Sequence, residues 1–240
     1  MSKVHSLAVM VGVCALAIAG SIGAASASPP NQINQKVNAY NYLHLFVSGT
    51  ATASWQTIAD SPLDPDGRAL VGTLPDNSIT TYVNAYSSAS RHINKAVGSI
   101  KNLSYDFQAD KTAGGDPRIS VIFSNGDVAY LNAQYCDQPL AASSYTWSRA
   151  DFTGSTTTDS APCSFMDSHG ATYASTATTS AWQAYVKAHP GQVVSQTIFV
   201  LDYPPDTGGS YAVDRISLGT GWMYHASSNH ADKCPTEAVC

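Results

Sequence analysis

The residues best suited to binding chemistry are Trp147 and its polar neighbours Arg149 and Asp151. Sugars are bound by exposed aromatic rings beside polar side chains, because the C–H face of a pyranose packs on a ring while its hydroxyls form hydrogen bonds. Trp222 and Tyr224, near the C-terminus, could line the same end of the molecule. These five residues form a candidate ligand-binding platform. For any single ring, a place in the core or on the sheet surface is the alternative.

Carboxyl groups are the candidates for catalysis. A glycosidase needs two positioned carboxyl groups, one of them held protonated. The chain has a single glutamate, Glu237, and four aspartates that lie in or beside predicted strands: Asp106, Asp151, Asp202 and Asp214. Each aspartate could instead cap a turn or pair with an arginine. We therefore expect no catalysis, and a polysaccharide-acting hydrolase or lyase stays the less favoured alternative.

Two further reaction classes have weak support. The segment 208–212 (GGSYA) is the nearest approach to a Gly-x-Ser-x-Gly nucleophile motif, but it lies in a predicted turn rather than between a strand and a helix. The residues His225, His230, Cys234 and Cys240 have ligand types that suit zinc. Their spacing matches no common zinc site, and cysteines of exported proteins oxidise.

The N-terminus has the pattern of a signal peptide. A short basic start with Lys3 precedes an apolar run over residues 7–19, and Ala25–Ala27 (ASA) forms a small-x-small cleavage site. We expect residues 1–27 to be removed and the product to be secreted and soluble. The formal net charge of −5 and the absence of a basic run argue against nucleic acid and anionic lipid as partners.

The four cysteines outside this segment predict two disulfides, for which three connectivities are possible. We favour pairing of neighbours, Cys136 with Cys163 and Cys234 with Cys240. A free or intermolecular Cys240 is the main alternative.

The elements that would position these residues are short strands. Ile119–Leu131 predicts a hairpin, since Asn125-Gly126 between β-rich runs is typical of a type I′ turn. Residues 180–189 predict one helix, capped by Ser180 and stopped by Pro190-Gly191. Gln192–Gly219 predicts the two closing strands as a pair joined by a tight reversal. We expect residues 28–45 to form a flexible leader, although the sequence does not specify whether they are ordered, and residues 46–240 to form a single all-β sandwich domain.

The segment Tyr211–Leu218 (YAVDRISL) resembles the closing strand of secreted jelly-roll carbohydrate-binding modules of the galactose-binding-like type. The resemblance implies a jelly-roll antiparallel sandwich and a structural calcium held by Asp214 with an acidic N-terminal partner. Residues 28–59 contain no Asp or Glu, so that partner is missing. We expect a secreted, non-catalytic domain that binds an extracellular or cell-surface glycan. A structural or surface protein-interaction domain is the alternative; the oligomeric state stays open.

Overall fold

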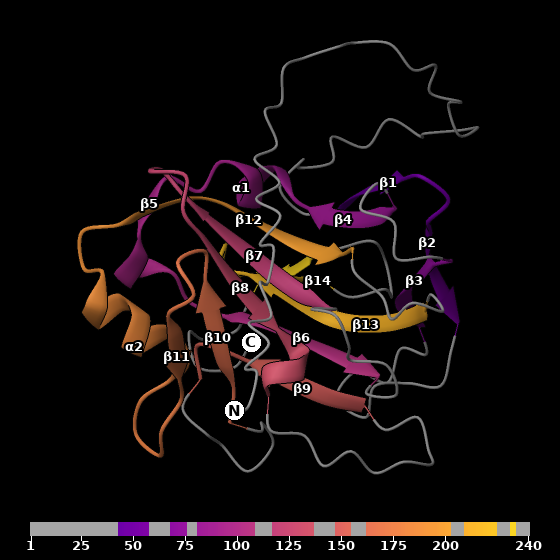
Figure 1. The fold of residues 1–240 in the computed structure, drawn as a ribbon. Coiled ribbons are helices and arrows are strands. Elements are labelled where there is room, and N and C mark those ends of the chain that lie inside the picture. The colour runs from indigo at the N-terminus through magenta and orange to yellow at the C-terminus, as the bar shows by residue number, and fades with distance from the viewer. Residues whose placement is uncertain are drawn as a thin grey trace, which may run out of the picture. The chain divides into compact units, whose positions relative to one another are not determined.

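The computed structural model describes residues 43–57, 68–75, 81–108, 117–136, 147–154, 162–202, 209–224 and 231–233 (Figure 1). All of them belong to the unit Val37–Cys240. They form two antiparallel sheets and few helices, which confirms the predicted all-β sandwich. The predicted signal peptide, leader residues 28–42 and the candidate zinc residues lie outside the described residues. None of the described helices is long and apolar enough to cross a membrane.

Sheet A contains the predicted hairpin. In spatial order its strands are β1 (His44–Ser48), β4 (Tyr82–Tyr86), β12 (Val193–Leu201), β7 (Arg118–Phe123), β8 (Val128–Asn132), β10 (Ser164–Asp167) and β11 (Thr172–Ala174), and β5 (Lys95–Ala96) also pairs with β12.

The hairpin β7–β8 is confirmed, but its turn is not of type I′. Gly126 has φ 91°, whereas Asn125 is not among the residues with positive φ. The loop spans residues 124–126, and the Phe123 amide donates to the Asp127 carbonyl across its base (2.9 Å). A three-residue loop needs the left-handed conformation only at its last position, where glycine stands.

Sheet B is branched around its longest strand. Its strands are β15 (Ala231–Lys233), β14 (Trp222–Tyr224), β13 (Gly209–Leu218), β3 (Arg68–Leu74) and β2 (Thr52–Thr57), with β6 (Leu103–Gln108) beside β13 and β9 (Trp147–Asp151) beside β6. Strand β13 pairs with β3 through residues 209–213 and with β14 through Ile216 and Ser217. It pairs with β6 on its other edge, with a shift in register after Asp214.

The core lies between the sheets. Apolar residues of both sheets form one buried cluster. Tyr105 of β6 shows the contact directly: its ring meets Phe199 of β12 edge-on at 5.4 Å, and its hydroxyl donates to the carbonyl of Leu131 in β8 (3.1 Å). Alternation along β6 places Leu103, Tyr105 and Phe107 on this face, as apolar residues two apart in a strand predict.

The closing strands do not pair with each other, so that prediction is wrong. Strand β12 lies in sheet A between β4 and β7, and β13 lies in sheet B. The chain crosses from one sheet to the other, and the Thr197 hydroxyl donates to the Leu218 carbonyl between them (2.6 Å). Proline and glycine indicate a reversal, but they do not specify whether the strands lie side by side or face to face.

The helix α2 (Ala181–Ala188) is confirmed with its predicted cap. The Ser180 hydroxyl accepts from the Gln183 amide, and the Gln183 side chain accepts in return from the Ser180 amide, a capping box. Trp182 is only 2% exposed, and its indole donates to the carbonyl of Val97 in the 3-10 helix η1 (Val97–Ser99). The other described helices are short: α1 (Ser88–Arg91) and the 3-10 helix η3 (Ala133–Tyr135).

The disulfide Cys136–Cys163 is present and buried. It joins the end of η3 to the start of β10, across an isolated antiparallel bridge between the same two residues. The predicted pairing of neighbouring cysteines is therefore confirmed for the first bridge. Cys234 and Cys240 lie outside the described residues.

Candidate functional site

In the structure, the predicted platform on β9 contacts other residues of the protein. The Arg149 guanidinium donates to Asp106 Oδ1 at 2.9 Å and to the Ser104 hydroxyl at 3.0 Å, both on the neighbouring strand β6. The side chain of Arg149 is 9% exposed and that of Asp106 is 1% exposed. Trp147, at the start of the same strand, is half-buried. The contacts of Arg149 thus bind one strand of sheet B to the next.

Asp151 caps the turn that follows β9. Its Oδ1 accepts from the amides of Thr153 (3.0 Å) and Gly154 (2.8 Å). A Cβ at Gly154 would lie 2.3 Å from Asp151 Oδ2, so a larger residue there would displace the Asp151 carboxylate. This is the turn-capping role that the sequence leaves open as an alternative for an aspartate.

Trp222 and Tyr224 lie in β14, on the side of sheet B opposite to β9 across β13 and β6. Tyr224 is 2% exposed, and burial raises the pKa of its hydroxyl. Trp222 is half-buried and packs against the core. The structure therefore does not bring Trp147 and Trp222 onto neighbouring strands.

The surroundings of Asp214 do not fit the calcium site that the resemblance implies. Asp214 is fully buried directly opposite Asp106, and its Oδ1 accepts from the Arg215 amide at 2.8 Å. Two arginines supply positive charge to the neighbouring Asp106. Arg215 lies 3.6 Å from Asp106 Oδ2, and Arg149 contacts Asp106 Oδ1. Among the described residues, no three histidine, cysteine or acidic side chains gather as metal ligands would.

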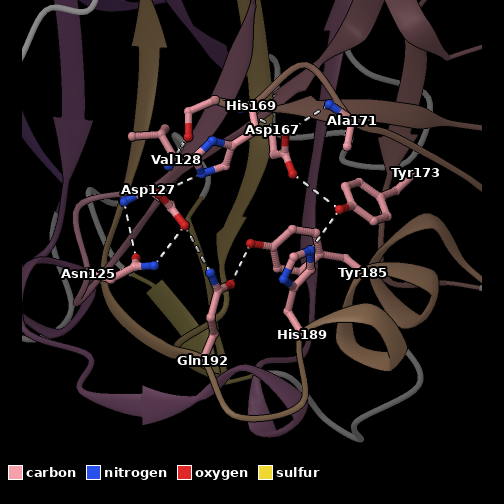
Figure 2. A network of polar contacts seen from close by, with 11 residues as sticks. Asn125, Asp127, Val128, Asp167, His169, Ala171, Tyr173, Tyr185, His189 and Gln192 are labelled. Atoms are coloured by element: carbon pink, nitrogen blue, oxygen red, sulfur yellow. Dashed lines mark hydrogen bonds and ion pairs between the residues drawn. The ribbon is translucent and has the colours of Figure 1, made fainter.

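Polar groups from separate segments, some exposed and some buried, converge instead near the far edge of sheet A, in the network that Figure 2 shows. The groups come from the β7–β8 turn, the β10–β11 turn, strand β11, helix α2 and the loop that follows it. The pairing of β8 with β10 brings the two turns together, and the Ser168 amide donates to the Val128 carbonyl at 2.7 Å. We call this set the turn network; its side chains are Asn125, Asp127, Asp167, Ser168, His169, Tyr173, Tyr185, His189 and Gln192.

Asp127 is the centre of one half of the turn network. Its Oδ1 accepts from His169 Nε2 at 2.9 Å, and its Oδ2 accepts from Asn125 Nδ2 at 2.7 Å and from Gln192 Nε2 at 3.2 Å. An ionised carboxylate only accepts, so the contact with Asp127 places a proton on His169 Nε2. The side chain of His169 is 67% exposed and that of Asp127 is 25% exposed, so both reach solvent.

Asp167 organises the other half. Its Oδ1 accepts from the amides of His169 and Ala171, both at 2.9 Å, and so holds the β10–β11 turn. Its Oδ2 accepts from the Tyr173 hydroxyl at 3.1 Å. The same hydroxyl lies 2.7 Å from His189 Nε2. Because its single proton is given to Asp167, we assign the proton of the second contact to His189.

Aromatic rings form the floor under these polar groups. The His189 ring stacks on Tyr185 at 4.4 Å, and Tyr173 meets Tyr185 edge-on at 4.8 Å. Phe165 and Trp182 pack behind them. The Tyr185 hydroxyl donates to Gln192 Oε1, which joins the floor to the Asp127 half of the network.

The charges of the turn network follow from these contacts. Burial opposes ionisation of Asp127, but hydrogen bonds from Asn125 and His169 and the positive charge of the two histidines lower its pKa overall. Burial, together with the charge of Asp167, raises the pKa of Tyr173 and of Tyr185. The network therefore holds two neutral phenols beside an aspartate that stays ionised.

No protein-family model, curated protein or solved structure matches this chain.

The sequence pattern does not indicate the turn network. Its residues stand in three separate segments, NGD at 125–127, DSHG at 167–170 and the end of the helix, and each alone is an ordinary turn or cap. The signal that could have indicated it is the repetition of a polar side chain beside a turn glycine, with His169 next to Gly170 and Asp127 next to Gly126. Their proximity depends on strand pairing that the sequence alone does not specify.

Proposed function

We propose that the protein is a non-catalytic binding domain for an extracellular or cell-surface glycan, and that the turn network is its binding site. The observation that supports this most is the convergence, at an exposed edge, of amide, carboxylate and imidazole groups over a floor of stacked rings. Sugar hydroxyls need donors and acceptors together, and Asn125, Asp127 and His169 offer both. The rings of Tyr173 and His189 are half-buried and lie beside them, where they can supply apolar surface to a sugar.

Hydrogen bonds already hold the side chains of the proposed site in place, and this preorganisation favours binding of a ligand that makes only weak contacts. The side chains of Asp127, Gln192 and Tyr173 each make two or more hydrogen bonds within the network. Groups already fixed in place lose little side-chain entropy when a ligand binds, and this loss costs about 0.5–1.5 kcal/mol for each flexible side chain.

We also propose that the protein is exported, with cleavage after Ala27. The buried disulfide Cys136–Cys163 supports this, since stable disulfides form in oxidising compartments. N-terminal sequencing of the protein recovered from culture medium tests it. A new N-terminus at Ser28 would support export with cleavage, and a chain retained in cells with Met1 intact would contradict it.

A glycan array tests the binding function. The oxidised protein is screened beside His169→Ala and Asn125→Ala, with Gln56→Ala as the matched control, because Gln56 is an exposed amide on β2 of the other sheet. We expect binding by the unchanged protein and by Gln56→Ala, and an approximately ten-fold or larger loss in the two network variants, the loss of one good hydrogen bond. Trp147→Ala is run as a fourth variant.

The outcomes separate the alternatives. Binding that only Trp147→Ala removes would place the site on β9 and refute the turn network. An absence of binding to every glycan by folded protein would refute the glycan function and favour a protein-interaction domain.

A further inference from the structure

A second surface, at the opposite edge of sheet A, combines exposed rings with positive charge. Strand β1 is the last strand at this edge, and it contains two of the most exposed apolar side chains described, Phe46 at 50% and Val47 at 38%. The β10–β11 turn of the turn network lies five strand pairings from β1, on the order of 25 Å at roughly 4.8 Å for each pairing, whereas the β7–β8 turn lies three pairings from β1. The two surfaces share no side chain.

The rings of β1 and β4 form two pairs on one face of the sheet. His44 lies directly opposite Tyr86 in the strand register, and their rings are 5.9 Å apart. Phe46 stacks on Tyr82 with the rings 6.0 Å apart and an angle of 30° between their planes. We call these four residues the aromatic ladder. Asn84, opposite Phe46, places an amide between the two tyrosines on the same face.

This face is separate from the core. Val83 and Ala85, which alternate with the ladder residues along β4, are fully buried between the sheets. Tyr82, Asn84 and Tyr86 are half-buried, and His44 and Phe46 are exposed. The aromatic ladder is thus a flat apolar surface with a polar group in its middle, at the margin of the sheet.

A cation lies at one end of the aromatic ladder. The guanidinium of Arg91, the last residue of α1, sits over the Tyr86 ring, 5.2 Å from its centroid. The Arg91 side chain belongs to an exposed residue, and no described carboxylate forms an ion pair with it. Its N–H groups can therefore meet an anion while its flat face stays on the ring.

The two segments that contain the aromatic ladder and Arg91 carry a charge opposite in sign to that of the whole chain. The chain carries a net charge of −5, yet residues 43–57 and 81–101 contain no Asp or Glu. Those segments hold Arg91, Lys95 and Lys101 together with His44 and His92. The two segments that contain the rings thus hold cationic side chains and no carboxylate, which favours an acidic partner.

We propose that the aromatic ladder and Arg91 form a second binding site, specific for an anionic polysaccharide. The rings of Phe46 and Tyr82 hold the C–H face of a sugar, Asn84 bonds its hydroxyls, and the Arg91 guanidinium pairs with a carboxylate or sulfate on the chain. A polymer suits an open sheet face, because it gains affinity from several weak contacts in a row. This site goes beyond the function proposed for the turn network and does not depend on it.

Binding of defined polymers tests this proposal. The probes are polygalacturonate, which carries carboxylates, dextran sulfate, which carries sulfate esters, and neutral dextran. Titration is followed by calorimetry with the full chain and with Phe46→Ala and Arg91→Gln. The matched controls are Tyr135→Ala, another exposed ring, and Lys187→Gln, a cation on α2.

We expect one of the two anionic polymers to bind and neutral dextran not to bind. The polymer that binds shows whether the anion is carboxylate or sulfate. Phe46→Ala and Arg91→Gln should each raise the Kd about ten-fold, and the controls should stay within about two-fold. Added salt should weaken binding by the unchanged protein more than binding by Arg91→Gln. His169→Ala, which tests the turn network, should leave this Kd unchanged.

Three results would overturn the proposal. The first is that neither anionic polymer binds the folded protein. The second is that the control variants lose as much affinity as the ladder variants. The third is that phosphatidylcholine vesicles containing phosphatidylserine bind while both polymers do not, which would indicate a membrane surface as the partner. A dimer that Phe46→Ala dissociates, in the absence of polymer binding, would equally refute it in favour of contact with a second copy.

Discussion

Replacement of Arg149 by methionine should destabilise the protein strongly, because Arg149 compensates a buried charge. Asp106 is fully buried, and the pairing of β6 with β13 places the buried Asp214 directly opposite it. Two like charges across a strand pair are unfavourable unless positive groups balance them. Arg149 provides the closer contact, at 2.9 Å from Asp106 Oδ1, and Arg215 is 3.6 Å from Oδ2.

The expected loss of stability depends on the ion pair that remains in the variant. Removal of one partner of a buried ion pair costs about 3–5 kcal/mol. Arg215 stays beside Asp106 in Arg149→Met, so we expect a loss at the lower end, about 3 kcal/mol. For a chain of this length, each kcal/mol lowers the Tm by about 2–4 °C, and the expected decrease is about 6–12 °C.

Urea unfolding followed by the fluorescence of the four tryptophans measures this loss. The double variant Arg149→Met with Asp106→Asn is the internal control. If the loss arises from an uncompensated carboxylate, neutralising Asp106 should restore part of the stability that Arg149→Met removes. A loss below about 1 kcal/mol for Arg149→Met, or a double variant less stable than Arg149→Met alone, would refute the electrostatic reasoning.

Three further predictions concern the disulfide, the helix and the turn network. Replacing both Cys136 and Cys163 by serine should lower the free energy of unfolding by about 3–4 kcal/mol, since the bridge closes a loop with a sequence separation of 27, and urea unfolding under oxidising conditions measures it. Ser180→Ala should cost about 1 kcal/mol through loss of the α2 cap, read from thermal unfolding. The folded-state pKa of Asp127 is below its ordinary value of 3.8, so its contribution to stability is complete above that pH and is lost as the pH falls through the folded-state pKa. Thermal unfolding of Asp127→Asn between pH 2 and about 5 should therefore show a weaker dependence on pH than that of the unchanged protein.

Each of these has its own control. The serine variant should match the unchanged protein once dithiothreitol is added to both, and a persistent difference would assign the loss to packing. Thr178→Ala, an exposed site before the helix, should leave the Tm unchanged, and an equal loss there would count against the cap. Identical pH profiles for Asp127→Asn and the unchanged protein would contradict the lowered pKa of Asp127.

Much of the local structure is predictable because it depends on neighbours in sequence. Ser180 and Gln183 form the cap of α2 within one turn, and Gly126 alone supplies the left-handed position of the β7–β8 loop. The type of that turn was predicted wrongly, since the Asn-Gly pair is compatible with both two-residue and three-residue loops.

The sheet assignment of strands is where sequence reasoning fails. Strands β12 and β13 both contain consecutive buried residues, and such a pattern fits a strand in either sheet. Contacts between side chains distant in sequence cannot be predicted for the same reason. Arg149 meets Asp106 rather than a ligand because β9 pairs with β6, a contact that spans 43 residues.

The passage of the chain from β12 to β13 has a consequence for the folding pathway. These strands lie at the middle of the two sheets, yet residues 202–208 alone connect them. Closing a short loop costs less chain entropy than closing a long one, so their contact, marked by Thr197 and Leu218, brings the centres of the two sheets together at a low entropic cost. We expect this arch to be formed in the transition state, with outer strands such as β1 and β2 joining later. The two sheets would then grow outward together from a common centre, rather than one sheet serving as a template for the other.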